Sequence, residues 1–234
     1  MWKIKHIFDG DYGCEDHTYD QGETMVSVTL VDQKGEEKYE TVADAWLRKN
    51  HLDVGSEWPD FSNVKIETKD LVLKKAVFSD WKDIYENLWS HAESTRYMLW
   101  KPTLSETEAK DRMKQTLIFQ KYHKYAFFVY EKITGKAVGF AGMKDTENGV
   151  YEETGIAIGP DYVGRGYGTQ VLNALVEEAK TAGGTQFFSA CRKQNIASHQ
   201  LQMKCGFTFS HYEECIDKRN GEPYVLEHNV KNLV

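Results

Sequence analysis

The chain has 234 residues, of which 41% are hydrophobic and 28% charged, a balance typical of one or two globular domains with a buried core. No apolar run of about 18 residues is present, and the scattered cysteines form no C-x-x-C pair, so a membrane span, a disulfide framework and a zinc site are not expected. A reducing, cytoplasmic setting fits. The net charge is −7, so no basic face for a nucleic acid is expected either.

The first 60 residues are predicted to form a small β-rich module. The elements expected there are strands at 25–31 and 38–42 and a helix at 43–49. The Gly, Ser and Pro residues of 55–62 indicate a linker. A module of this size is close to the lower limit of independent stability. We therefore predict an accessory module at 1–60 and a second domain at 66–234.

From residue 70 onward, strand and helix patterns alternate along the chain. The best-defined helix covers about 167–182, where five apolar side chains form one stripe. The other elements expected are strands at 71–77, 125–131, 137–143, 151–158, 186–190, 208–216 and 224–228, and helices at 80–90, 106–121 and 197–204. This mixture predicts an α/β (α+β) fold class, with one mixed central sheet flanked by helices.

A glycine-rich loop, Gly164, Gly166 and Gly168, precedes the best-defined helix. Glycines let backbone N–H groups approach a ligand closely, and a helix N-terminus carries partial positive charge, so a phosphate suits this position. Arg165 adds a cation at the same place. The loop lacks the ending of a P-loop, and no acidic residue ends the next strand as in a dinucleotide site. A coenzyme A pyrophosphate site and a turn without a ligand remain as interpretations.

The loop and a later segment together resemble two signatures of the GNAT superfamily of N-acetyltransferases. Gly166 and Gly168 match the small positions of the motif Gln/Arg-x-x-Gly-x-Gly/Ala, whereas Val163 departs from its first position. The second signature, Asn-x-x-Ser/Ala-x(5)-Lys-x-Gly-Phe, is matched by Asn195, Ser198, Lys204, Gly206 and Phe207. The loop variant is common in the branch that resembles ribosomal-protein N-terminal (alanine) acetyltransferases. The resemblance covers about residues 69–230.

This resemblance implies a GNAT-like fold that uses acetyl-CoA and transfers its acetyl group to a primary amine by direct attack in a ternary complex. It also implies a catalytic carboxylate on the strand before the loop, where Glu153 stands. Because strand side chains alternate, Glu153, Gly155 and Ala157 are expected on one face and Glu152 on the other. The implied cofactor-binding residues are Ile156 and Ile158, through their backbones, and Val163, Gly164, Arg165, Gly166, Tyr167, Gly168, Thr169, Asn195 and Ser198.

Several of these positions also have a plainer explanation. Glu153 could be a surface charge at a strand end, and Asn195 and Ser198 could simply cap the following helix. Many family members carry a tyrosine, as proton donor, where this chain has Gln202. Glutamine is a poor acid, and His199 and Tyr212 are the nearby substitutes. A non-catalytic acyl-CoA-binding module, with the acidic N-terminal segment recruiting a partner, is therefore the alternative to an enzyme.

The acceptor side is less defined. Residues 96–102 resemble the acceptor-side segment of the same branch, although their aromatic side chains could equally belong to the core. The acceptor amine is a protein N-terminus or a small molecule, and the sequence leaves this choice open. Members of the family often dimerise, so a homodimer is a further alternative.

The N-terminal module raises two questions of its own. Residues 8–17 are rich in potential metal-binding side chains, but their spacing does not match a calcium loop, and one Cys and one His are too few for a soft metal. Turn chemistry accounts for the segment, so no metal is expected. Residues 1–65 contain 14 acidic and 7 basic side chains, which carry the whole charge excess. This excess either attracts a cationic substrate or partner or serves solubility.

Overall fold

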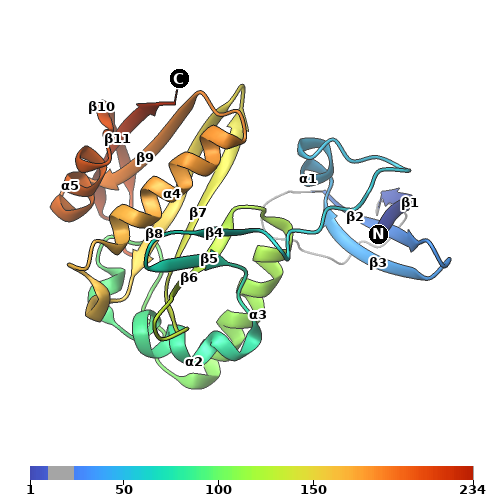
Figure 1. Ribbon diagram of the computed structural model, residues 1–234, viewed down its shortest axis with the longest axis horizontal. Coiled ribbons are helices and arrows are strands. Elements are labelled where there is room, and N and C mark those ends of the chain that lie inside the picture. Colours follow the sequence, from blue (N-terminus) through green and yellow to red (C-terminus); the bar gives the residue numbers. More distant parts are fainter. Residues whose placement is uncertain (10–23, 234) are drawn as a thin grey trace. The chain divides into compact units, whose positions relative to one another are not determined.

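The computed structural model describes residues 1–9 and 24–233 (Figure 1), which divide into two compact units, Met1–Asp60 and Phe61–Val234. The second unit begins slightly before the boundary predicted at 66, because Val64 and Ile66 pack against its core. The potential metal-binding side chains noted at 10–17 lie outside the described residues. Within the described ranges, no group of three or more His, Cys, Asp or Glu side chains could hold a metal ion. No helix in those ranges has the length and apolar character to cross a membrane.

The first unit is an antiparallel sheet with one short helix. Its strands β1 (Trp2–Asp9), β2 (Met25–Asp32) and β3 (Glu37–Ala43) lie in that order, and α1 (Asp44–Lys49) follows β3. Strand β1 was not predicted, because Ile4 is its one buried hydrophobic side chain and a bulge between Ile4 and His6 interrupts its alternation. A strand with one buried position has no period-two signal in the sequence.

The second unit is built on one eight-stranded sheet. The spatial order of its strands is β10-β11-β9-β8-β7-β6-β5-β4, and only the β8–β9 pair among them is parallel. The bounds are β4 (Lys65–Glu67), β5 (Leu71–Lys74), β6 (Ala126–Glu131), β7 (Ala137–Glu147), β8 (Val150–Ile158), β9 (Gln186–Arg192), β10 (Thr208–Ile216) and β11 (Pro223–Asn232). The predicted mixed sheet is therefore present, with the short edge strand β4 added.

Helices cover both faces of this sheet and bury two separate apolar cores. The stripe of α4 (Tyr167–Thr181) packs with Phe187 and Phe207 on one face, beside α5 (Ile196–Lys204). On the other face, α2 (Trp81–Ile84), the π-helical turn η2 (Tyr85–Trp89) and α3 (Glu106–Tyr122) pack against Phe128 and Tyr130. Short 3-10 turns lie at η1 (Phe78–Asp80), η3 (Ala92–Thr95) and η4 (Pro160–Tyr162).

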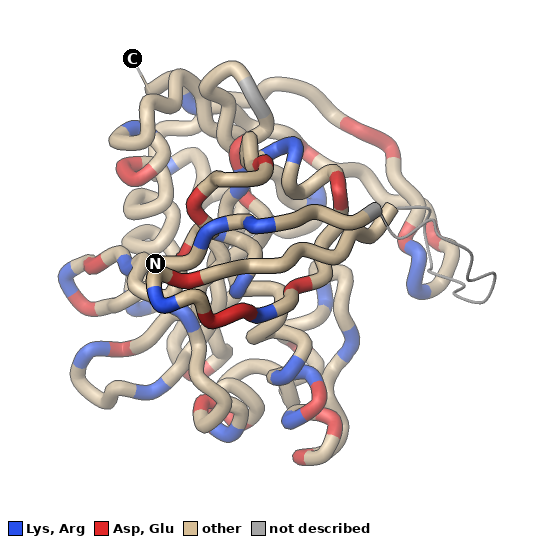
Figure 2. The backbone as a smooth tube through the Cα atoms, turned by 90° about the vertical axis from the view of Figure 1, so that its right-hand side faces the viewer, with Lys and Arg blue, Asp and Glu red and all other residues tan. Residues whose placement is uncertain are grey.

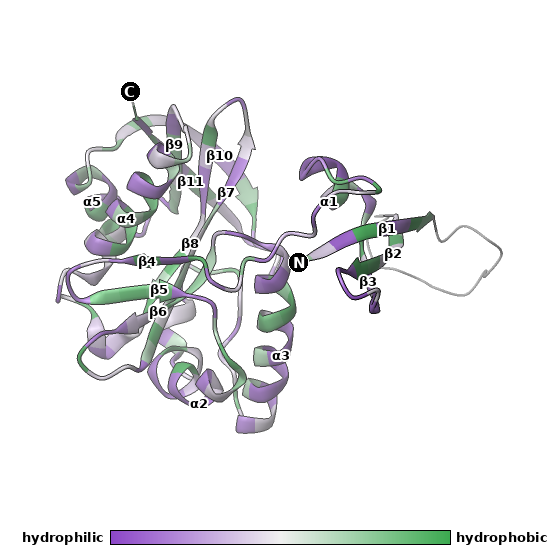
Figure 3. Cartoon of the chain, turned by 45° about the vertical axis from the view of Figure 1, so that its right-hand side comes forward, coloured by the Kyte–Doolittle hydropathy of each residue, from purple (hydrophilic) through white to green (hydrophobic). Residues whose placement is uncertain are grey.

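The buried side chains of the described residues are mainly apolar. Figure 3 shows β5 in green and α3 in a mixture of green and purple. Acidic and basic residues are interspersed along the chain in Figure 2. The sheet interior is therefore apolar, and the polar side chains that do enter it stand out as candidates for function.

A bulge in β8 sets the shape of the site. Gly142 pairs with Gly155 while the next residue, Met143, pairs with Glu153, so Thr154 is an extra residue in β8. Gly155 has φ of 134°, a conformation that glycine adopts without strain. The predicted shared face of Glu153, Gly155 and Ala157 is therefore wrong. The extra residue moves Ile156 and Ile158 onto the α4 side and Ala157 onto the opposite side.

Candidate active site

Strands β8 and β9 separate at the point where Glu153 stands. They pair over Val150–Glu152 and Gln186–Phe188 only, so the rest of β8 lacks a partner strand on that edge. A cavity of about 290 Å³ opens there, which we call the cofactor cavity. It brings together seven of the residues implied by the family resemblance: Glu153, Ile156, Ile158, Val163, Gly168, Asn195 and Ser198.

The glycine loop forms the N-terminus of α4 at the rim of this cavity. Gly164 and Gly166 have φ values of 78° and 79°, in the left-handed region that glycine occupies most easily, and Gly166 is the N-cap. The first N–H groups of a helix have no partner within the helix and lie at the positive end of its dipole. A methyl group on Gly168 would lie 3.2 Å from Leu201 Cδ2, so this glycine also lets α4 approach α5. The backbone of the loop therefore suits an anion.

The loop's two large side chains anchor it to the sheet. Arg165 Nη1 donates to Glu131 Oε1 at 3.1 Å, Arg165 Nη2 donates to the carbonyl of Asp161 at 2.9 Å, and the Tyr167 hydroxyl donates to the same Glu131 oxygen at 2.6 Å. The hydrogen bond from Tyr167, with help from Arg165, lowers the pKa of the buried Glu131 carboxyl. Glu131 was missed in the sequence, although an acidic residue that ends an apolar strand is a usable signal. The structure thus leaves backbone groups, rather than these side chains, for a ligand.

We expect Tyr167→Phe to lower the free energy of unfolding by about 1.5 kcal/mol, because it removes a hydrogen bond to a buried carboxylate. Urea denaturation measures the loss. The control is Tyr162→Phe, whose half-buried hydroxyl makes a longer bond of 3.4 Å to Asn87 Oδ1 and should contribute about 0.5 kcal/mol. Equal losses for the two variants would contradict the anchoring role of Tyr167.

The second signature forms the N-terminus of α5 on the other side of the cavity. Asn195 Oδ1 accepts a hydrogen bond from the Ser198 N–H at 3.2 Å, so the capping explanation holds for Asn195. The Ser198 hydroxyl accepts from Gln202 Nε2 at 3.3 Å, and Gln202 Oε1 accepts from Asn229 Nδ2 at 2.7 Å. Gln202 is thus a buried brace between α5 and β11. Both Asn195 and Ser198 still line the cavity.

The two candidate substitutes for the missing tyrosine lie elsewhere. His199 Nδ1 hydrogen-bonds Glu227 Oε1 at 2.5 Å, and the His199 side chain is 40% exposed. Tyr212 lies on β10, half exposed, with its ring 4.8 Å from that of Phe209. Neither lines the cofactor cavity. His199 and Tyr212 are close to Gln202 in sequence, but the helix and strand that carry them direct both side chains away from the cofactor cavity.

Glu153 is the titratable group at the centre of the site. Protein atoms crowd its carboxyl group, and this desolvation raises its pKa to about 7, against the opposing effect of hydrogen bonds from the Ser189 hydroxyl and the Ile156 N–H. Ser189 was missed in the sequence, where it is one small polar residue at an inward position of β9. A carboxyl whose pKa is raised toward neutral pH can take up and release a proton there, as suits a proton acceptor.

Glu153 also borders a second cavity, of about 280 Å³. This cavity is lined by Glu152, Glu153, Phe188, Ser189, Ala190, His211 and His228. The two imidazole rings stack at 4.4 Å, and His228 Nε2 lies 2.9 Å from Glu213 Oε2. Glu153 thus stands in the wall between two spaces, and one of them adjoins the glycine loop.

Residues 96–102, which resemble the acceptor-side segment of the family branch, reach the cofactor cavity. Tyr97 and Met98 line the cofactor cavity. The segment is held by Arg219, whose Nη1 donates to the carbonyls of Thr95 and Trp100 at 3.1 and 3.4 Å. Hydrogen bonds from Arg219 and Arg192 hold the pKa of the buried Asp217 carboxyl well below its usual value. The turn between β10 and β11 is therefore fastened to the acceptor-side segment by an ion cluster.

Comparison with known proteins assigns this chain to a family. The model of the acetyltransferase (GNAT) domain family matches residues 70–208, more than half of the chain. The chain belongs to the GNAT acetyltransferase family. Both the family and the fold class predicted from the sequence are confirmed. Members of this family use acetyl-CoA as the acetyl donor, and the α4 N-terminus offers the donors that its pyrophosphate needs.

Similar proteins agree with this assignment. An uncharacterised N-acetyltransferase of Bacillus subtilis, YobR, is 33% identical over 82 residues, which are 35% of this chain and 32% of that protein. The match thus spans about a third of the length of that relative. Among solved structures, a GNAT acetyltransferase from Bacillus anthracis has a TM-score of 0.62 at 18% identity, covering 73% of this chain and 99% of its own. The ribosomal L7/L12 α-N-protein acetyltransferase RimL, solved with coenzyme A, has a TM-score of 0.58 at 18% identity, covering 72% and 98%.

Proposed function

We propose that this GNAT protein transfers an acetyl group from acetyl-CoA directly to a primary amine in a ternary complex. The observation that carries the proposal is the position of Glu153. Its carboxyl has a pKa of about 7, and it borders both the cofactor cavity and the second cavity. A base at this point can reach an amine that enters from one side while the donor occupies the other.

The residues present fit the donor. The backbone N–H groups of Gly164, Arg165, Gly166, Tyr167, Gly168 and Thr169 at the loop and helix start would hold the pyrophosphate, and the Val163 side of the loop lines the cavity beside them. The edge of β8 around Ile156 and Ile158, left without a strand partner, would bond the amide groups of the pantetheine arm. Asn195 and Ser198 line the opposite wall. Bound acetyl-CoA supplies an activated acetyl thioester.

The chain's own contribution is to bind the amine and remove its proton. An ammonium is not a nucleophile, and Glu153 accepts its proton directly or through one water. The Ser189 hydroxyl, which donates to Glu153 Oε2, holds the carboxylate in place while it titrates. Gln202 is neutral and braces Ser198, so it positions the α5 side of the site without exchanging a proton.

The acceptor is proposed as a primary amine. Structural neighbours include an acetyltransferase of the ribosomal L7/L12 α-amine, so both a protein N-terminus and a small amine are candidates. The alternative of a non-catalytic acyl-CoA-binding module rests on Gln202 in place of the usual tyrosine. Glu153, with its raised pKa between two cavities, favours the enzyme.

The test is the release of free coenzyme A from acetyl-CoA with and without each member of a panel of amines, followed by mass determination of the product. We expect release that depends on the amine and a product heavier by one acetyl group. Acetyl-CoA that binds with micromolar affinity while no amine increases its consumption would support the binding module instead.

A further inference from the structure

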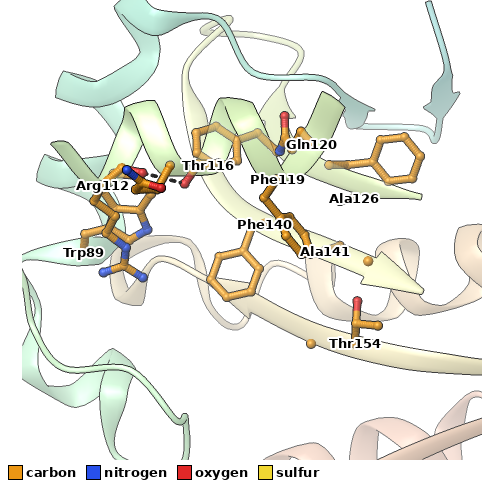
Figure 4. A pocket seen from close by; sticks show the side chains of 14 residues that line it. Trp89, Arg112, Thr116, Phe119, Gln120, Ala126, Phe140, Ala141 and Thr154 are labelled. Carbon is orange, nitrogen blue, oxygen red and sulfur yellow. Dashed lines mark hydrogen bonds between the residues drawn. The ribbon is translucent and has the colours of Figure 1, made fainter. Parts of the chain in front are cut away.

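A third cavity, of about 350 Å³, lies between α3 and strands β6, β7 and β8 (Figure 4). It is open because Ala126 pairs with Gly142 and Gly142 pairs with Gly155, so one row across the three strands has almost no side-chain volume. Aromatic side chains form much of the remaining wall: Trp89, Phe119, Phe127, Phe128 and Phe140. At about 30 Å³ for each water-sized group, the cavity has room for a body of roughly ten non-hydrogen atoms. We call it the aromatic cavity.

The aromatic cavity is separate from the two cavities that Glu153 borders. Among the described residues, none that lines the aromatic cavity also lines the cofactor cavity or the second cavity. The Glu153 carboxylate accepts a hydrogen bond from the Ser189 hydroxyl, so it faces β9 and not the aromatic cavity. A molecule held under α3 is therefore neither the acetyl donor nor the amine acceptor of the proposed reaction.

One end of the aromatic cavity contains a cation without a matching anion. Arg112 is the one charged side chain among the described residues that line this cavity. Its guanidinium lies between the rings of Trp89 and Trp100, 4.3 and 4.4 Å from their centroids, and its Nη1 donates to Thr103 Oγ1 at 3.0 Å. In the described part of the chain, no carboxylate forms an ion pair with Arg112, unlike the other buried arginines of this unit.

The surroundings of Arg112 contain more hydrogen-bond donors than acceptors. The indole N–H groups of Trp89 and Trp100 are both buried without an acceptor within the described residues. Burial lowers the pKa of Arg112 to about 10, so the guanidinium is partly removed from water while it stays charged at neutral pH. The nearby Glu108 uses its carboxylate to accept from the Leu104 N–H at 2.8 Å. Because a partly buried cation without an anion is unfavourable, this end of the cavity suits an anionic ligand.

We propose that the aromatic cavity is a second ligand site, which binds a small monocarboxylate with an apolar, ring-sized body and pairs its carboxylate with Arg112. A guanidinium presents a planar fork of N–H groups that matches a carboxylate, and indole rings against its two faces leave its edge for the ligand. Figure 4 shows Arg112 and Thr154 on opposite sides of Phe140, so the apolar body extends from Arg112 along the Phe140 ring. This inference goes beyond the proposed acetyl transfer and does not depend on it.

Binding is measured by the tryptophan fluorescence of the native protein without acetyl-CoA. The probes are 4-methylbenzoate, the neutral 4-methylbenzamide, and acetate, which has the charge without the ring. The benzoate should bind at least tenfold more tightly than the benzamide, because a charge-assisted pair exceeds a neutral hydrogen bond. It should also bind at least tenfold more tightly than acetate, because its ring is buried against apolar walls. Equal affinities in either comparison would overturn the proposal.

Arg112→Gln should reduce the ratio of benzoate to benzamide affinity to about one, and Arg112→Lys, which keeps the charge without the fork, should retain part of it. Lys114→Gln is the matched control, because it removes a positive charge from the same helix at an exposed position paired with Asp111, and it should leave the ratio unchanged. A ratio that survives Arg112→Gln contradicts the proposal. If that variant does not fold, the full native ratio in Arg112→Lys contradicts it equally.

A titration with saturating coenzyme A distinguishes the aromatic cavity from the glycine loop, which also suits an anion. Because the aromatic cavity and the cofactor cavity have different lining residues, the affinity for 4-methylbenzoate should change by less than a factor of about two. Displacement of the benzoate by coenzyme A would place the anion at the loop and overturn the proposal. Tight benzoate binding by a protein that acetylates no amine would support this site and count against the proposed function alone.

Discussion

Glu153→Gln should lower the amine-dependent kcat about 10²- to 10³-fold at pH 7.5 and leave the affinity for acetyl-CoA within a factor of about two, because it removes the proton acceptor and keeps the shape of the cavity. In the native protein the rate should rise between pH 6 and 8 with a midpoint near the Glu153 pKa of about 7. This rising limb of the pH profile should be absent from Glu153→Gln. The measurement is a pH profile of kcat/KM with saturating acetyl-CoA.

Glu152→Gln is the control for this limb. Glu152 is the neighbouring residue, points to the opposite face of β8 and pairs with Lys144 at 2.8 Å. Its variant should retain the limb near pH 7 whatever its effect on acceptor binding. If Glu153→Gln keeps the native rate and the native profile with every accepted amine, Glu153 is not the base.

Thermal stability gives an independent check that the Glu153→Gln variant is folded. The pKa of Glu153 is raised in the native state, so the native state loses stability relative to the unfolded chain as the pH rises from about 4.5 to 7. The Glu153→Gln side chain cannot ionise, so this variant does not lose stability in that way. The variant should therefore unfold at a higher temperature than the native protein at pH 8, and the difference should shrink toward pH 5.

The parts of this site that were predicted from the sequence depend on local patterns. The stripe of α4 follows from helical period, and Gly164 and Gly166 follow from the left-handed conformation that glycine adopts most easily. The signature residues Asn195 and Ser198 were expected near the loop and do share a cavity with Val163. Each of these features can be recognised within a window of about ten residues.

The parts that were missed depend on partners far away in the chain. The bulge at Thr154 arises from the pairing of β8 with Gly142 on β7, and it changes which side chains of β8 share a face. Likewise, the anchoring of the loop by Glu131 needs a contact across more than 30 residues of sequence. No single-strand periodicity contains this information, so the direction of Ile156 could not be read from spacing alone.

A substitution at Gly159, directly after β8, is expected to have a large effect on stability. A methyl group on Gly159 would lie well inside van der Waals contact with the backbone carbonyl oxygen of Asn87 in η2, and no flexible side chain can yield there. We expect Gly159→Ala to lower the free energy of unfolding by about 3 kcal/mol, at the upper end for overpacking, because backbone must move. Urea denaturation at pH 7 measures this loss.

Gly164→Ala provides the comparison that separates crowding from backbone conformation. Gly164 has φ of 78° with no atom within 4 Å of an added methyl group, so alanine there should cost about 1 kcal/mol. Gly159, by contrast, bonds Val138 through its N–H and Tyr162 through its carbonyl, at 2.8 and 2.9 Å, so its displacement moves the start of the glycine loop. Acetyl-CoA affinity should therefore fall at least tenfold in Gly159→Ala and less in Gly164→Ala. The reverse order in both stability and affinity would show that the loop is positioned by its own glycines and not by the packing of β8 against η2.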